Sequence, residues 1–161
     1  MLSSNSEEIG IHYNIYKEDV QKEIFTQESD TTIFDQKIEL ATEGLEPYYL
    51  DHLKTRISRK NSIIIARYIL SMRIETNLSL NHRRSIITSL KMLSEFLSNK
   101  PFPEMNREDI LSYLESLRKS DASDKMHKWV STYNQRVITF LRFFKWLYAP
   151  NTEASKREKP R

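Results

Sequence analysis

The fold of this chain is decided by residues 128–148, KWVSTYNQRVITFLRFFKWLY. Large apolar side chains recur there every three or four positions, which is the period of an amphipathic α-helix. They are Val130, Tyr133, Val137, Phe140, Leu141, Phe144 and Leu147. We therefore predict one helix over 128–148 that buries a broad stripe and is closed by Pro150. Phe143 and Trp146 lie off this stripe, and we expect them to cover the first predicted helix or to dock against a second domain.

Three shorter helices are predicted before this segment, because apolar residues recur at the same period. Their expected bounds are 62–76, 81–98 and 107–118. Asn77 is the expected stop of the first, and Asn81 is a candidate N-cap of the second. Asn106 is the expected cap of the third, with Asp109 three residues later as in a capping box.

The composition of the 161 residues favours an all-α protein. With two glycines, Gly10 and Gly44, the chain lacks the turns of a sandwich or barrel and the glycine loops of nucleotide-binding folds. It has no cysteine, which excludes disulfides and thiolate chemistry and favours an intracellular setting. No apolar run approaches the roughly 20 residues needed to span a bilayer. We expect a cytoplasmic protein with no membrane partner.

Charge divides the chain into an acidic start and a basic remainder. Residues 1–50 hold 3 Lys/Arg and 11 Asp/Glu, whereas residues 51–161 hold 22 and 11. Such asymmetry is typical of a nucleic-acid-binding body with an acidic arm, although two differently solvated surfaces would give the same counts. We expect a mobile or partly helical arm over 1–49, a helical DNA-binding body over 50–150 and a polar linker over 151–161. One hypothesis is that the arm lies over the basic face as a mimic of DNA.

The sequence shows no self-sufficient active site. Its four histidines are scattered, without the spacing of an HExxH motif or an i, i+4 pair, and there is no cysteine to complete a metal site. The glycine motifs of nucleotide-binding proteins and the GxSxG motif of hydrolases are missing. We therefore expect no enzymatic activity from this chain, no metal or other cofactor, and no small-molecule substrate.

Basic and amide side chains gather near the starts of the second and fourth predicted helices. The expected DNA contacts on the second helix are Arg83, Arg84 and Lys91. Those before and within the fourth helix are Lys125, Lys128, Asn134, Gln135 and Arg136. Helix N-termini attract anions, and these side-chain types bind phosphates or base edges, so the two starts indicate one shared nucleic-acid surface. The alternative is that the charges are only the solvated side of amphipathic helices.

Three motifs stand out within this order of helices. They are Leu90 with Phe96-Leu97, Asn106-Arg107-Glu108-Asp109-Ile110, and Leu141-Arg142-Phe143-Phe144-Lys145-Trp146-Leu147-Tyr148. With the helix order, they make residues 55–150 resemble the core-binding domain of tyrosine recombinases, the phage integrase and Xer-type family. The resemblance implies a four-helix SAM-like orthogonal bundle whose second and fourth helices face double-stranded DNA, as one half of a C-shaped clamp.

The catalytic residues of that family lie in a second, carboxy-terminal domain. They include a His-x-x-Arg motif, which this chain does not contain. The resemblance therefore implies a fragment that grips DNA beside the crossover site, with other recombinase protomers as partners in a synaptic complex and a prokaryotic or viral host. Many relatives have threonine and tyrosine where this chain has His82 and Ile86. Only the general basic face is therefore carried over.

Two other interpretations stay open. A small helical interaction protein would use Phe143 and Trp146 against a protein partner, and its basic face would only be solvated. A stand-alone regulator would bind recombinase sites and block them. An open reading frame that continues past Arg161 into a His-x-x-Arg motif favours the recombinase fragment, and a stop codon there counts against it.

Overall fold

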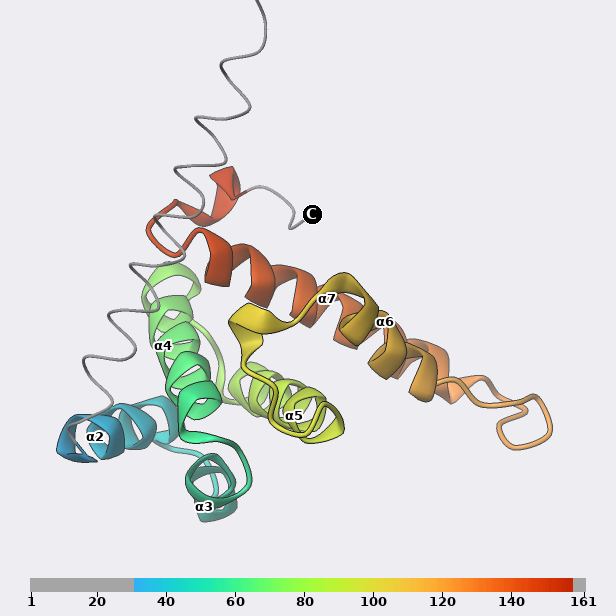
Figure 1. Cartoon of the computed structure of the whole chain (residues 1–161), viewed down its shortest axis with the longest axis horizontal. Coiled ribbons are helices and arrows are strands. Elements are labelled where there is room, and N and C mark those ends of the chain that lie inside the picture. Colours follow the sequence, from blue (N-terminus) through green and yellow to red (C-terminus); the bar gives the residue numbers. More distant parts are fainter. Residues whose placement is uncertain (1–30, 158–161) are drawn as a thin grey trace, which may run out of the picture.

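The computed structural model describes residues 31–157 of the chain (Figure 1). This range holds six α-helices and two short 3-10 helices without any β-strand, so the described part is all-helical as predicted. The α-helices are α2 (Thr31–Thr42), α3 (Pro47–Thr55), α4 (Arg59–Thr76), α5 (Leu80–Phe96), α6 (Arg107–Ser116) and α7 (Lys128–Tyr148). The 3-10 helices are η1 (Phe102–Glu104) and η2 (Ala154–Lys156).

α7 has the predicted bounds and packs against α4, α5 and α6 (Figure 1). Phe140, Phe144 and Leu147 of its apolar stripe are buried. Phe143 is also fully buried, and Trp146 is 6 % exposed. Both cover α4, which was one of the two roles predicted for them. Their burial excludes the other predicted role, docking against a second domain or a protein partner.

Side chains cap the starts of α4, α5 and α6, and two of these starts differ from the prediction. α4 begins at Arg59 and not at residue 62, because the hydroxyl of Ser58 accepts the N–H of Asn61 at 3.3 Å. α6 begins with the predicted capping box, in which Asn106 and Asp109 each accept the other's backbone N–H at 2.9 Å. α5 is capped by Ser79, whose hydroxyl accepts the N–H of His82 at 3.3 Å, and not by Asn81. A serine hydroxyl at this position satisfies a first-turn N–H that has no partner within the helix, so α5 begins earlier than predicted.

A fully buried amide joins α4 to α5 and η1. Asn61 is 0 % exposed, and its Nδ2 donates to Ser94 Oγ at 2.8 Å and to the Lys100 carbonyl at 3.0 Å. Its Oδ1 accepts the N–H of Phe102 at 3.0 Å. Both amide hydrogens and the amide oxygen are therefore satisfied, which makes Asn61 a fixed point of the bundle.

The helical body starts earlier than predicted. The expected boundary at residue 50 falls inside α3, and α2 lies within the range assigned to the acidic arm. Ile38 and Ala41 of α2 are fully buried, and the Phe34 ring lies 4.6 Å from the guanidinium of Arg59 on α4. α2 therefore belongs to the core. Residues 1–30 of the expected arm lie outside the described residues, and so does most of the segment to which the hypothesis of a DNA mimic refers.

Arg83 links α5 to the C-terminal end of α2 through a hydrogen bond. Its side chain is 5 % exposed, and its Nη1 donates to the carbonyl oxygen of Ala41 at 3.1 Å. A cation at this position satisfies a carbonyl in the last turn of α2 and interacts favourably with the helix dipole. Burial lowers the pKa of Arg83. Arg83 is therefore a structural bridge, and it does not reach the surface on which a DNA contact was predicted.

Candidate nucleic-acid interface

Three more of the predicted DNA contacts already have partners within the protein. Arg84 forms an ion pair with Glu46 through two hydrogen bonds of 2.9 Å, which holds the pKa of that carboxyl below its usual value. The ammonium group of Lys91 lies 3.6 Å from the carboxylate of Glu95, one turn further along α5. Arg136 reaches from α7 to α5 and donates to Ser89 Oγ. These side chains balance charge or join helices, which makes them weak candidates for phosphate contacts.

The other four predicted residues lie on different sides of α7. Lys125 and Lys128 are exposed at its start. Gln135 faces α5 and donates to Ser85 Oγ at 2.9 Å, whereas Asn134 lines a groove on the α6 side. The start of α5 faces the second half of α7 and not its start. The two cationic helix starts therefore do not form the single surface that was predicted.

A cleft opens between the start of α5 and the second half of α7. It consists of two adjoining hollows of about 250 and 600 Å³. The residues that line both hollows are Tyr68, His82, Ile86 and Arg142. The smaller hollow is also lined by Ser85, Gln135, Ile138 and Thr139, and the walls of the larger one include Ser79, Lys145 and Arg157. We call this surface the α5–α7 cleft.

Cations line the α5–α7 cleft, and none of its described lining residues is acidic. The side chains of His82, Arg142 and Lys145 have no ion-pair or hydrogen-bond partner within residues 31–157. Arg142 and Lys145 were not among the predicted contacts, because the predicted cations were those near helix starts and these two lie in the second half of α7. Positions 135, 138, 142 and 145 are three, four and three residues apart, which places them on one face of α7, and this spacing was the signal that could have found them.

The N-terminus of α5 lies at the edge of the cleft, where Ser79 and His82 form part of the lining. The backbone N–H groups of Leu80 and Asn81 have no acceptor in the described part of the chain. Free N–H groups and the helix dipole place partial positive charge at a helix start. This charge adds to that of the two α7 cations across the cleft.

Tyr68 of α4 lies beneath the cleft. Its ring packs against Phe143 and Trp146 of α7, with 5.2 Å between ring centroids in both pairs. Only 2 % of Tyr68 is exposed, and burial raises the pKa of its hydroxyl to about 12, although Arg142 and Arg157 act in the opposite direction. The phenol is therefore protonated and neutral at physiological pH.

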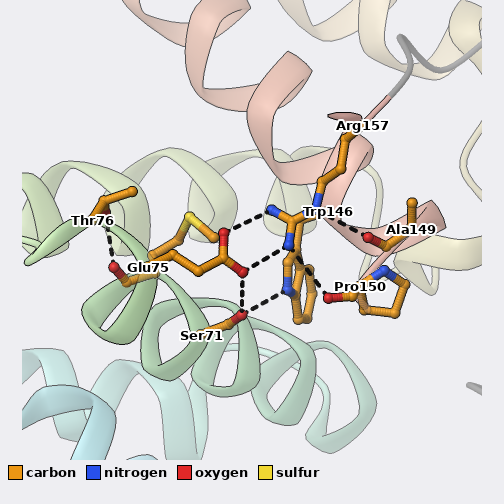
Figure 2. Close-up of polar contacts among 8 residues, drawn as sticks. Ser71, Glu75, Thr76, Trp146, Ala149, Pro150 and Arg157 are labelled. Atoms are coloured by element: carbon orange, nitrogen blue, oxygen red, sulfur yellow. Dashed lines mark hydrogen bonds and ion pairs between the residues drawn. The ribbon is translucent and has the colours of Figure 1, made fainter. Parts of the chain in front are cut away.

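Arg157 closes one end of the cleft by folding the chain after α7 back onto α4 (Figure 2). Its guanidinium donates to the Glu75 carboxylate at 2.7 and 3.1 Å and to two backbone carbonyls that follow α7 at 3.0 and 3.3 Å. Ser71 Oγ donates to the same carboxylate at 3.2 Å and accepts the indole N–H of Trp146 at 3.1 Å. The expected polar linker over 151–161 is therefore held to α4 by Arg157, while residues 151–153, 155 and 156 are exposed.

Replacing Arg157 with glutamine is expected to lower the free energy of unfolding by about 2 kcal/mol, because charge-assisted hydrogen bonds to Glu75 are lost. Urea denaturation followed by tryptophan fluorescence measures this. Lys156→Gln is the matched control, since Lys156 is exposed and its pairing with Glu153 lies at the surface; its expected change is below about 0.5 kcal/mol. Equal effects of the two substitutions would mean that Arg157 does not hold the segment in place.

A second, apolar groove lies on the other side of α7, against α6. It has a volume of about 470 Å³, and its lining includes Ile110, Leu111, Val137, Leu141 and Phe144. Leu111 and Leu141 are each 42 % exposed. Contiguous apolar surface of this kind is typical of sites where proteins or ligands dock.

Residues 31–157 contain no group of three or more histidine, aspartate or glutamate side chains placed to hold a metal ion. No helix of the described part has the length and apolar composition required to cross a membrane. Comparisons of the chain with models of protein families, with curated proteins and with solved structures find no match.

Proposed function

We propose that the α5–α7 cleft binds the phosphate backbone of duplex DNA. The observation that carries the proposal is the set of three side chains His82, Arg142 and Lys145, which meet at a helix N-terminus without any acidic residue in the described lining. Arg142 and Lys145 lie about one helical turn apart without a counter-charge in the described lining and repel each other, so the arrangement becomes favourable when an anionic partner binds. Nucleic acids supply such a partner as a regular row of phosphates.

A row of mostly basic and polar residues, interrupted by Ile138, extends along most of α7. Its positions, each three or four residues from the next, are Lys128, Ser131, Gln135, Ile138, Arg142 and Lys145. At 1.5 Å per residue this row is about 25 Å long. It matches roughly seven base pairs at 3.4 Å each. The cations at its two ends therefore fit contacts to phosphates that lie about seven base pairs apart along a duplex.

A duplex fits the cleft better than a single strand does. Proteins that bind single strands without sequence preference stack the bases on exposed aromatic rings. The aromatic ring that lines the cleft, Tyr68, is 2 % exposed, and its neighbour Trp146 is 6 % exposed. No described residue of the cleft therefore offers a platform for stacked bases.

The finer proposal is that helices α4 to α7 are the SAM-like core-binding domain of a tyrosine recombinase. It is supported by the helix order and by the position of the cationic cleft. The cleft lies between α5 and α7, which correspond to the second and fourth helices of the core-binding domain. On this proposal the chain grips DNA beside a crossover site, a separate domain cleaves the strands, and other protomers join it in a synaptic complex. A stand-alone regulator would use the same cleft, so both versions share the test below.

The proposed interface is tested by measuring the binding of the full chain to a fluorescent 20-base-pair duplex over a range of salt concentrations. We expect log Kd to rise linearly with log salt concentration. Each cation that neutralises a phosphate contributes about 0.9 to this slope, so Arg142→Ala/Lys145→Ala is expected to reduce it by about 2.

A matched control removes the same charge elsewhere. Arg56→Ala/Arg107→Ala takes away two arginines that lie at α3 and α6, outside the described lining of the cleft. We expect this control to keep the wild-type slope. If the wild-type chain does not bind at low salt, or if both pairs reduce the slope equally, the cleft is not a DNA interface.

The α6–α7 groove carries a second candidate function, the docking of a protein partner. Leu111 and Leu141 favour it because both are large apolar side chains left 42 % exposed beside a groove. This differs from the interaction surface predicted from the sequence, since Phe143 and Trp146 are buried. Absence of DNA binding in the salt titration would leave this function as the better supported one.

A further inference from the structure

The hydroxyl of Tyr68 is a polar group that the fold does not use. Tyr68 is 2 % exposed and lines both hollows of the cleft, yet its hydroxyl has no hydrogen-bond partner within residues 31–157. Phenylalanine would pack its ring on Phe143 and Trp146 equally well, so the hydroxyl adds nothing to the packing.

Tyr68 lies beside Arg142 in the cleft, since both residues line each of its two hollows. The ring contacts α7 at Phe143 and Trp146, while the charges that act on the hydroxyl are those of Arg142, Arg157 and Glu75. Arg157 is already neutralised by Glu75, at 2.7 Å. Arg142 has no such partner in the described part, so it and the phenol are left facing the same open space.

Several polar groups at this point of the cleft can donate hydrogen bonds. Tyr68 offers a phenol O–H, Arg142 and Lys145 offer charged N–H groups, and the first turn of α5 offers free backbone N–H groups. An anion with several acceptor oxygens satisfies such a set, and a phosphate group has both the oxygens and the charge. A base edge satisfies it less well, because it carries no negative charge.

We propose that Tyr68, Arg142 and Lys145 form a phosphate-binding subsite, in which the Tyr68 hydroxyl donates a hydrogen bond to a phosphate oxygen. The inference rests on the proposed function for the source of the phosphate, a DNA phosphodiester, while the same chemistry also fits inorganic phosphate. With a pKa of about 12, the hydroxyl keeps its proton throughout the physiological range and is always a donor. Tyr68 fixes one phosphate in the cleft, and the two cations hold its charge.

Tyr68→Phe tests the subsite because it removes one oxygen and keeps the ring. We expect duplex DNA to bind about tenfold more weakly at a fixed salt concentration, since a hydrogen bond to a charged group is lost. The salt slope should stay at the wild-type value because no cation is removed, in contrast to Arg142→Ala/Lys145→Ala. The thermal midpoint should be unchanged or slightly higher, since the hydroxyl makes no bond within the described fold.

Tyr113→Phe is the matched control. Tyr113 is also buried, at 3 % exposed, but it lies on α6 and lines neither hollow. The Tyr113→Phe variant should bind duplex DNA with the same affinity as the wild-type chain. If Tyr68→Phe also binds like the wild type while Arg142→Ala/Lys145→Ala lowers the slope, the DNA interface stands and the Tyr68 subsite is overturned.

Inorganic phosphate separates failure of the subsite from failure of the proposed function. If the wild-type chain binds no duplex at low salt, the thermal midpoint is measured with increasing phosphate, with chloride at equal ionic strength as reference. A phosphate-dependent rise that Tyr68→Phe abolishes supports the subsite without the DNA. If phosphate does not raise the thermal midpoint of the wild-type chain, the subsite is overturned together with the DNA interface.

Discussion

Replacing Phe143 with alanine is expected to lower the free energy of unfolding by about 3–5 kcal/mol. Phe143 is fully buried, and its ring centroid lies 4.9 Å from that of Phe102, 5.1 Å from that of Phe144 and 5.2 Å from that of Tyr68. The substitution removes apolar contacts with α4 and η1 together and leaves a cavity between them. Urea denaturation at 25 °C, followed by circular dichroism, measures the change.

Leu141→Ala is the control for this substitution. Leu141 is two residues away on the same helix but 42 % exposed, so about 1 kcal/mol or less is expected. A cost for Phe143→Ala that does not exceed the cost for Leu141→Ala would mean that the aromatic cluster does not hold the helices together. The cluster also matters for the cleft, because the ring of Tyr68 rests on Phe143.

The helix bounds were the most predictable part of the structure because their signals are local. The bounds of α7 and the capping box of α6 follow from residues within a few positions of each helix end. α2 was missed for the same reason, since acidic residues interrupt its apolar pattern and only contact with α4 shows that Ile38 and Ala41 are core residues. The apolar period of a segment therefore predicted that it forms a helix better than it predicted whether that helix packs into the core.

The candidate site was harder to predict than the helix bounds. A cationic side chain can bind DNA only if the fold does not already pair it with an acceptor within the protein. The acceptors of Arg83 and Arg84 are the Ala41 carbonyl and Glu46, which lie 42 and 38 positions earlier in the sequence. Nothing near the two arginines indicates these pairings. In the sequence, Arg142 and Lys145 do not differ in kind from Arg83 and Arg84. The structure nevertheless leaves the side chains of Arg142 and Lys145 without ion-pair or hydrogen-bond partners in the described part.

The helices that carry the proposed interface are joined by cations other than those proposed to bind DNA. Arg136 joins α7 to α5 through Ser89, and Arg157 joins the end of α7 to α4 through Glu75. The cations that serve structure and those proposed to bind DNA are therefore different residues on the same helices. Substitutions can for that reason separate loss of binding from loss of folding, which the unfolding and binding measurements compare directly.

Asn61→Leu is expected to lower the free energy of unfolding by about 3–5 kcal/mol, although leucine is apolar and similar in size. The substitution leaves the Phe102 N–H and the Lys100 carbonyl without the partners that they have at 3.0 Å. A buried polar group without a partner costs about 1–3 kcal/mol, and two such groups are created. Replacing a polar residue by an apolar one in the core is therefore strongly unfavourable at this position.

Asn134→Leu makes the same chemical change at an exposed position of α7 and is expected to alter the free energy of unfolding by about 0.5 kcal/mol or less. Ser94→Ala is the intermediate case, since Ser94 supplies one acceptor to Asn61 while the amide keeps its other two bonds. We expect it to cost about 1 kcal/mol. The order Asn61, Ser94, Asn134 in urea denaturation supports the amide as the fixed point between α4, α5 and η1. If Asn61→Leu costs no more than Ser94→Ala, burial of the leucine compensates for the lost hydrogen bonds, and the position of α5 depends on apolar packing alone.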